Sequence, residues 1–114
     1  MSNLLEALRN AGNDVDDALA HFMGNEDMYV RFLGKLQADD SFDKLNAAFA
    51  AGDVKETFAA SHTLKGVLGN LGLTKLVNLN TPIVETARGG DLPQAADVEA
   101  FKVAYVETLA LING

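Results

Sequence analysis

The sequence predicts an all-α protein, an antiparallel up-down four-helix bundle with one or two short N-terminal helices packed against it as a lid. Apolar residues recur at helical spacing along the chain, no segment shows sustained alternation of β-branched residues, and there are only two prolines. The segments between the long helical stretches are short. Short connections make consecutive helices antiparallel neighbours, which predicts the up-down topology.

Residues 1–24 are expected to form the short helices. The first should end near Gly12, and Asp14 should cap the second, because its carboxylate can accept a hydrogen bond from a free backbone N–H. Gly24 is expected to close the second helix. The residues predicted to face inward are Leu4, Leu5, Leu8, Val15, Ala18, Leu19 and Phe22.

Residues 26–51 carry the next apolar stripe. Asn25 is the expected N-cap, and two acidic residues follow it where the helix dipole favours anions. The pattern is interrupted at residues 39–41, which indicates either a kink or a new helix capped by Ser41. The residues predicted to face inward are Tyr29, Phe32, Leu33, Leu36, Phe42, Leu45, Ala48 and Phe49.

Residues 53–70 are predicted to form the second long helix. Asp53 followed by Glu56 is typical of a capping box, in which each residue satisfies a free backbone N–H of the other. Gly72 suits the position just beyond the end of this helix, where the backbone often turns left-handed. The residues predicted to face inward are Ala60, Leu64, Val67, Leu68 and Leu71.

Two further helices are expected over about 73–88 and 93–112. Pro82 falls inside the first and predicts a kink about one turn before it. Pro93 is expected to open the second, because its fixed φ suits a first helical turn. The residues predicted to face inward are Leu76, Leu79, Ile83, Ala87, Val98, Phe101, Tyr105, Leu109 and Ile112.

Length and composition limit the class of protein. The 114 residues are expected to form a single domain, 1–114, because a chain of this length can bury one core without cross-links. There is no Cys, so no disulfide framework, thiolate nucleophile or cysteine zinc site is expected. No apolar run approaches the ~20 residues of a membrane span, and no signal-peptide pattern is present. We therefore expect a cytoplasmic protein that does not bind membranes.

The charge of the chain is −7, which argues against a nucleic-acid partner, since binding to a phosphate backbone depends on a basic face. The charge is unevenly distributed. Residues 1–52 carry four basic and nine acidic side chains, residues 53–90 carry four and three, and residues 91–114 carry one and four. The only segment that is not acidic contains His62.

His62 is the candidate functional residue. At 100° per residue, the apolar side chains of residues 53–70 gather on one side of the helix and His62 points to the other. Gly66 and Gly69 lie within about 40° of His62 and remove side-chain bulk there, although each costs a helix interior roughly 1 kcal/mol relative to Ala. Lys65 lies on the same face, one turn along. Because a neutral imidazole can form covalent intermediates, we expect a site to which another molecule comes close.

The motif around this histidine consists of His62, Lys65, Gly66, Leu71 and Gly72. His-x-x-Lys-Gly followed by an apolar residue and Gly resembles the signature of histidine-containing phosphotransfer (HPt) domains of multistep phosphorelays. The resemblance extends upstream to Asp53 and to residues 22–26 with Tyr29 and Phe32, and covers nearly the whole chain. It favours one long, bent helix over residues 26–51.

The resemblance implies a role for each motif residue. His62 is the phosphoacceptor, Lys65 is the charge and hydrogen-bond partner of the phosphoryl oxygens, and Gly66 and Gly69 give clearance for a receiver domain. The implied partners are receiver domains of response regulators and a hybrid sensor histidine kinase, with Mg²⁺ in the acidic pocket of the receiver. We expect no cofactor or metal on this chain, and a monomer.

Two questions about the surroundings of His62 stay open. Phe58 lies one turn before His62, where the family commonly carries a polar residue. It either packs against the adjacent helix or, with Ala59, forms an apolar docking surface. In many family members a polar side chain of the neighbouring helix orients the histidine ring, and the candidates for this role are Asn78, Asn80 and Thr81.

Three functions fit these features. The first is a stand-alone phosphocarrier that moves a phosphoryl group between receiver domains; it is not an enzyme, because no Gly-rich phosphate loop followed by Lys and no paired acidic residues accompany His62. The second is the dimerisation and phosphoacceptor domain of a histidine kinase. It is disfavoured because that family has an acidic residue directly after its histidine and a proline shortly beyond, whereas Thr63 and Leu64 follow His62 here. The third is a helical scaffold without chemistry.

The remaining polar residues are interpreted as structural. His21 is expected to be a surface or capping residue at a helix end. A metal site is not expected, because metal sites in bundles use inward Glu-x-x-His motifs that this chain lacks. Asp14, Asp16 and Asp17 lack the Gly and terminal Glu of a calcium loop and more simply cap a helix.

Overall fold

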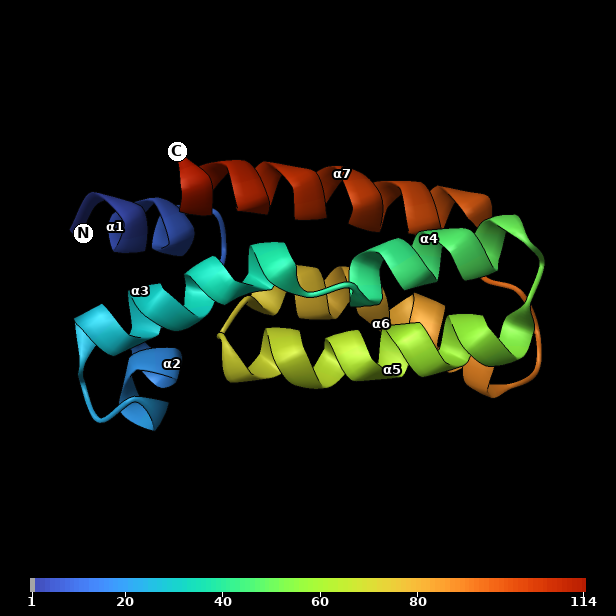
Figure 1. The fold of residues 1–114 in the computed structure, drawn as a ribbon, viewed down its shortest axis with the longest axis horizontal. Coiled ribbons are helices and arrows are strands. Elements are labelled where there is room, and N and C mark those ends of the chain that lie inside the picture. Colours follow the sequence, from blue (N-terminus) through green and yellow to red (C-terminus); the bar gives the residue numbers. More distant parts are fainter. Residues whose placement is uncertain (1) are drawn as a thin grey trace.

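The computed structural model describes residues 2–114, which are helical and contain no strand (Figure 1). The all-α prediction is therefore confirmed for this part of the chain. Its elements are α1 (Ser2–Asn10), α2 (Val15–His21), α3 (Glu26–Lys35), the 3-10 helix η1 (Leu36–Ala38), α4 (Ser41–Ala50), α5 (Val54–Asn70), α6 (Thr74–Arg88) and α7 (Ala95–Asn113).

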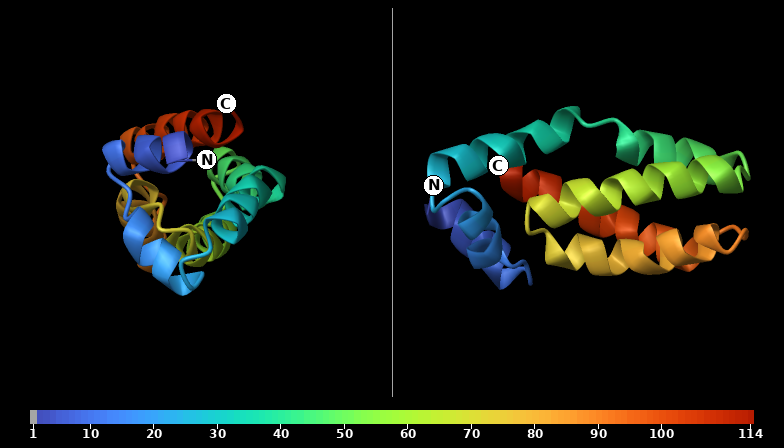
Figure 2. Two further views of the ribbon diagram at one scale, coloured as in Figure 1. Left: turned by 90° about the vertical axis from the view of Figure 1, so that its left-hand side faces the viewer. Right: turned by 90° about the horizontal axis from the view of Figure 1, so that it is seen from below.

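Helices α4 to α7 lie along the longest axis of a molecule that measures 41 × 24 × 22 Å (Figure 1). Helices α5, α6 and α7 each run in the direction opposite to the helix before them (Figure 1). Viewed from one end, the helices surround a common centre, with α5 between α4 and α6, and α6 beside α7 (Figure 2). Helices α1, α2 and α3 gather at the end that also holds the C-terminus, where α1 and α3 contact α7.

The core lies between these helices and matches the predicted inward faces. Every residue predicted to face inward is buried or partly buried except Phe32, which is 39% exposed. Tyr29 is fully buried, and its hydroxyl donates a 2.7 Å hydrogen bond to the Leu71 carbonyl at the end of α5. Phe42 of α4 stacks on Tyr105 of α7 with ring centroids 4.0 Å apart. The prediction for Phe32 is wrong because α2 and α5 leave a groove beside it.

Residues 26–51 do not form one helix. Helix α3 ends at Lys35, η1 follows, and Asp39 has an extended backbone (φ −77°, ψ 127°) before α4 begins. Ser41 is not the N-cap of α4, because it is the buried first residue of that helix. Its N–H donates a 2.8 Å hydrogen bond to Oδ1 of Asp39. In a continuous helix the Ser41 N–H would donate to a backbone carbonyl. Here the Asp39 carboxylate accepts that hydrogen bond instead, so the helix breaks at this point.

The three predicted N-caps are confirmed, although the Asp53 N–H donates to the Ala48 carbonyl at 2.9 Å and not to Glu56, as a full capping box requires. Asp14, Asn25 and Asp53 each accept a hydrogen bond from the backbone N–H three residues on, at 3.0–3.1 Å. Helix α6 is continuous through Pro82. Helix α7 begins at Ala95 rather than at Pro93, because Gln94 between them has the extended ψ of 137° that excludes it from a helix.

Gly72 joins the N-terminal helices to the turn between α5 and α6. Its φ is +66°, and its carbonyl accepts a 3.1 Å hydrogen bond from the N–H of Asp14. A Cβ at this position would lie 2.6 Å from Cβ of Ala18 and from the carbonyl oxygen of Asp14. Both the backbone angle and the close approach of α2 therefore require glycine here.

Candidate functional site

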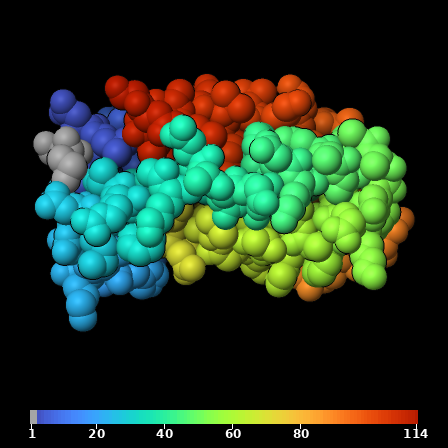
Figure 3. Space-filling model, viewed as in Figure 1, coloured from blue at the N-terminus to red at the C-terminus, as the bar shows by residue number. Residues whose placement is uncertain are grey.

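Helix α5 has one face buried in the core and another exposed to solvent. The buried side chains are Thr57, Ala60, Ser61, Leu64 and Leu68. The exposed positions include Ala59, His62, Lys65, Gly66 and Gly69. Figure 3 shows α4 and α5 side by side on one surface of the molecule, where α5 is open to solvent. The predicted exposure of His62 and of the residues around it is confirmed.

His62 lies against an aromatic ring rather than alone on this surface. The rings of His62 and Phe58, one helical turn apart, have centroids 5.4 Å apart and planes inclined by 23°. The guanidinium carbon of Arg88, the last residue of α6, lies 5.1 Å from the centroid of the half-buried Phe58 ring. Arg88 Nε also lies 3.4 Å from a carboxylate oxygen of Glu85. Phe58 thus contacts the adjacent helix through Arg88, and its part in an apolar docking surface stays a prediction.

The predicted polar partners on α6 do not reach the His62 ring. Asn80 is buried, and its amide Nδ2 donates a 2.9 Å hydrogen bond to the backbone carbonyl of Ser61, the residue before His62. Thr81 donates to the carbonyl of Val77 on its own helix, and Asn78 is exposed. Within residues 2–114, no side chain hydrogen-bonds to a ring nitrogen of His62. Asn80 therefore holds the backbone next to His62 instead of the ring.

Lys65 and the two glycines leave the surface beside His62 open. Lys65 is exposed and makes no ion pair within residues 2–114. A Cβ added to Gly66 or to Gly69 would meet no heavy atom within 4 Å. These glycines are consequently not required by packing inside the molecule, in contrast to Gly72. A small cavity of about 30 Å³ lies between Lys65 and α6, next to Asn80.

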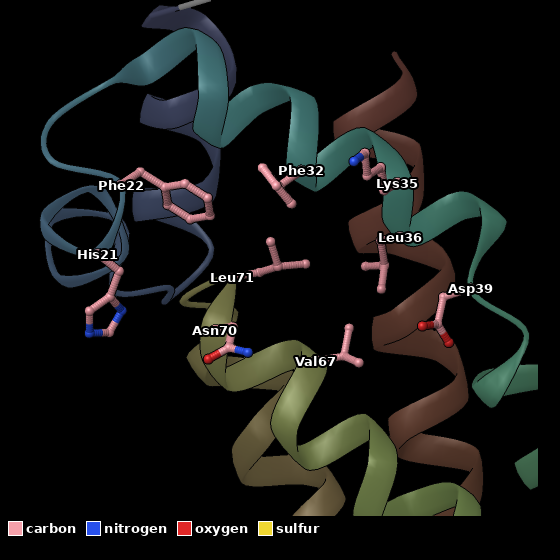
Figure 4. Close-up of a pocket in the computed structure, with 9 residues that line it drawn as sticks. All are labelled: His21, Phe22, Phe32, Lys35, Leu36, Asp39, Val67, Asn70 and Leu71. Carbon is pink, nitrogen blue, oxygen red and sulfur yellow. The ribbon is translucent and has the colours of Figure 1, made fainter.

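An open groove of about 440 Å³ lies where α2, α3 and η1 meet the last turn of α5 (Figure 4). Val67 and Leu71 form its floor with Phe22, Phe32 and Leu36 around them, and Lys35 lies over the Phe32 ring at 4.5 Å. The polar residues at its rim are His21, Lys35, Asp39 and Asn70. The sequence does not reveal this groove, because the helical spacing of Phe32 assigns it to the inward face.

The remaining features concern His21, metal binding and membrane spanning. His21 is exposed at the end of α2, as predicted. Among residues 2–114, no three His, Cys, Asp or Glu side chains are grouped so that they could hold a metal ion. Within the same range, every helix is too short or too polar to cross a membrane.

Comparison with known families and proteins gave one match. The family model described as Hpt domain matches residues 27–110, which include all of α4 to α6, most of α3 and α7, and the whole exposed face of α5. The comparisons with curated proteins and with solved structures found no match.

Proposed function

Because the chain belongs to the Hpt domain family, whose members transfer phosphoryl groups through a histidine in phosphorelays, we propose that it carries such a group on His62. One observation carries the proposal. His62 is exposed inside the matched region, on a face of α5 that also holds an unpaired Lys65 and two glycines without packing roles. A nucleophile, a cation and open space are what phosphoryl transfer between two proteins requires.

The transfer uses the in-plane lone pair of a His62 ring nitrogen. This nitrogen attacks the phosphorus of an aspartyl phosphate on a receiver domain, the N–P bond forms, the P–O bond to the aspartate breaks, and the receiver regains a free carboxylate. Lys65 offsets the charge of the phosphoryl oxygens during the transfer and in the phosphorylated protein. Mg²⁺ is supplied by the acidic pocket of the receiver. The reverse sequence of bonds passes the group to a second receiver domain.

The proposed partners are receiver domains of response regulators and of a hybrid sensor histidine kinase. Gly66 and Gly69 give them clearance, and Phe58 and Ala59 provide apolar contact at the other end of the same face. The groove beside Val67 and Phe32 lies at the C-terminal end of the same helix. We also propose that the long helices form an antiparallel up-down four-helix bundle with α1 and α2 as a lid. The carrier is monomeric and cytoplasmic, and it works as a separate protein. Figures 1 and 2 support the bundle arrangement.

The test uses the purified 114-residue chain. It is mixed with Mg²⁺ and a receiver domain phosphorylated by labelled acetyl phosphate, and the transferred label is characterised. We expect a label on His62 that is lost in acid and retained in base, as a phosphoramidate should be. No label on the chain, while the receiver is phosphorylated and binds it, would instead support a scaffold without chemistry.

A further inference from the structure

We propose that Phe58 is a positioning residue for His62, which stacks on the imidazole and holds it in the orientation from which a ring nitrogen reaches phosphorus. This inference rests on the proposed function of His62. It assigns Phe58 a role in the rate of transfer, separate from its contribution to docking.

The geometry of the two rings favours a stabilising contact. Phe58 and His62 are one turn apart on the same helix, the spacing at which side chains of a helix meet. Their centroid separation of 5.4 Å and inclination of 23° correspond to an offset stack, which aromatic pairs prefer to a face-to-face sandwich. Rotation about the bond to an imidazole ring has a broad energy profile, so a ring without a partner samples many orientations. The stack restricts this rotation.

Stacking is suited to a nucleophilic ring. The lone pair of an imidazole nitrogen lies in the plane of the ring, whereas Phe58 contacts the face of the ring. A hydrogen bond would occupy one of the two nitrogens, and within residues 2–114 no side chain makes one. The ring is therefore oriented by a contact that leaves the nitrogen with the in-plane lone pair free to react.

Arg88 extends this arrangement to the neighbouring helix. Its guanidinium lies over the Phe58 ring at 5.1 Å, within the range of a cation–π contact, and its Nε is held at 3.4 Å from Glu85. A planar guanidinium stacks on an aromatic face better than an ammonium does. The Phe58 ring is thus held from α6 as well as by its own helix, so the orientation of His62 depends on how α5 and α6 pack.

The first measurement is the NMR spectrum of the unphosphorylated protein, which does not depend on transfer. Phe58→Leu should remove the ring-current shift of the His62 ring protons and increase averaging of its side-chain couplings, and Phe58→Tyr should retain both features. Phe42→Leu is the matched control, because Phe42 is also half-buried and stacked, but on Tyr105. His62 signals that do not change in Phe58→Leu would overturn the inference.

The second measurement is single-turnover transfer from a phosphorylated receiver over a range of receiver concentrations. Phe58→Leu should lower the rate at saturation about threefold to tenfold, from the strength of an aromatic pair, with the half-saturating concentration little changed. Phe58→Tyr should restore the rate, and Arg88→Gln should lower it less, with Arg9→Gln as control. A change confined to the half-saturating concentration would overturn the inference and leave Phe58 as a docking residue. A wild-type chain that accepts no phosphoryl group would overturn the proposed function itself.

Discussion

The two faces of α5 differ in what they contribute. On the inward face, Leu64 and Leu68 are completely buried among the side chains of the other helices. On the outward face, His62 and Lys65 are exposed, and Gly66 has no neighbour that a Cβ would touch. The inward face therefore contributes to the free energy of folding, and the outward face adds little to it.

The outward face even reduces the stability of the helix. Two glycines in its interior cost roughly 1 kcal/mol each relative to Ala, and among residues 2–114 no heavy atom lies within 4 Å of where a Cβ would stand. Gly72, a few residues on, is different, because its positive φ and its contact with α2 require glycine. The segment thus contains glycines of two kinds: the fold requires Gly72, whereas Gly66 and Gly69 are proposed to give clearance to a partner. The following predictions test this division.

The largest expected effect is the loss of phosphoryl acceptance in His62→Gln. Because His62 is exposed, the variant should keep the thermal stability of the wild type and accept no label from a phosphorylated receiver. His21→Gln is the matched control, since His21 is the other histidine, is exposed, and should still leave a chain that accepts label. If His62→Gln is labelled as efficiently as the wild type, the outward face is not the reactive face.

Gly66→Leu should cause the next largest effect. Leucine at an open position of α5 should leave stability equal or higher, because its helix propensity is better than that of glycine by several tenths of a kcal/mol. Transfer should nevertheless collapse, because the side chain blocks the approach of a receiver. Gly34→Leu, at an equally open position of α3, is the control. Normal transfer by folded Gly66→Leu would show that the partner approaches from another side.

Leu64→Ala should have the opposite effects, a loss of stability with unchanged transfer. The fully buried side chain is replaced by a cavity, so the free energy of unfolding should fall by about 2–5 kcal/mol. The fraction that remains folded should still accept a phosphoryl group at the wild-type rate. Leu111→Ala, at a 40% exposed position, should change stability far less. Denaturant titration and transfer at low temperature measure the two quantities separately.

Asn80→Ala should destabilise the contact between α5 and α6. The variant leaves the Ser61 carbonyl without the amide donor of Asn80, which should lower the free energy of unfolding by about 1–3 kcal/mol. Backbone amide shifts should change near His62, the next residue. Asn78→Ala, at an exposed position of the same helix, is the control. Equal stability of the two variants would mean that the hydrogen bond across the helices contributes nothing.

Lys65→Ala should have the smallest effect. An exposed charge makes a modest contribution, so transfer should slow by roughly threefold to tenfold and the phosphohistidine should hydrolyse faster. Lys65→Arg should retain most of the rate, and Lys75→Ala should retain all of it. The difference between wild type and Lys65→Ala should shrink at high salt, because ions screen exposed charges. Identical rates and lifetimes at both salt concentrations would show that Lys65 is a solvated surface charge.

The amino-acid sequence determined those features that depend on near neighbours in the chain. Helical periodicity identified the buried and exposed faces of α5, including the exposure of His62. The three caps were predicted because a capping side chain binds a backbone group only three residues away. The sequence left open whether residues 26–51 form one helix or two, and the structure divides them because the Asp39 side chain competes locally with the helix.

The tertiary structure decided what surrounds His62. Helices α5 and α6 pack side by side. This packing places Arg88 of α6 over the Phe58 ring that stacks on His62, with Glu85 beside Arg88. It also brings Asn80 within hydrogen-bond distance of the Ser61 carbonyl. The groove beside Phe32 likewise exists because α2, α3 and α5 meet without filling the space between them. Periodicity gives the direction in which a side chain leaves its own helix. It does not give the position of the neighbouring helix, which is set by the packing of the whole core.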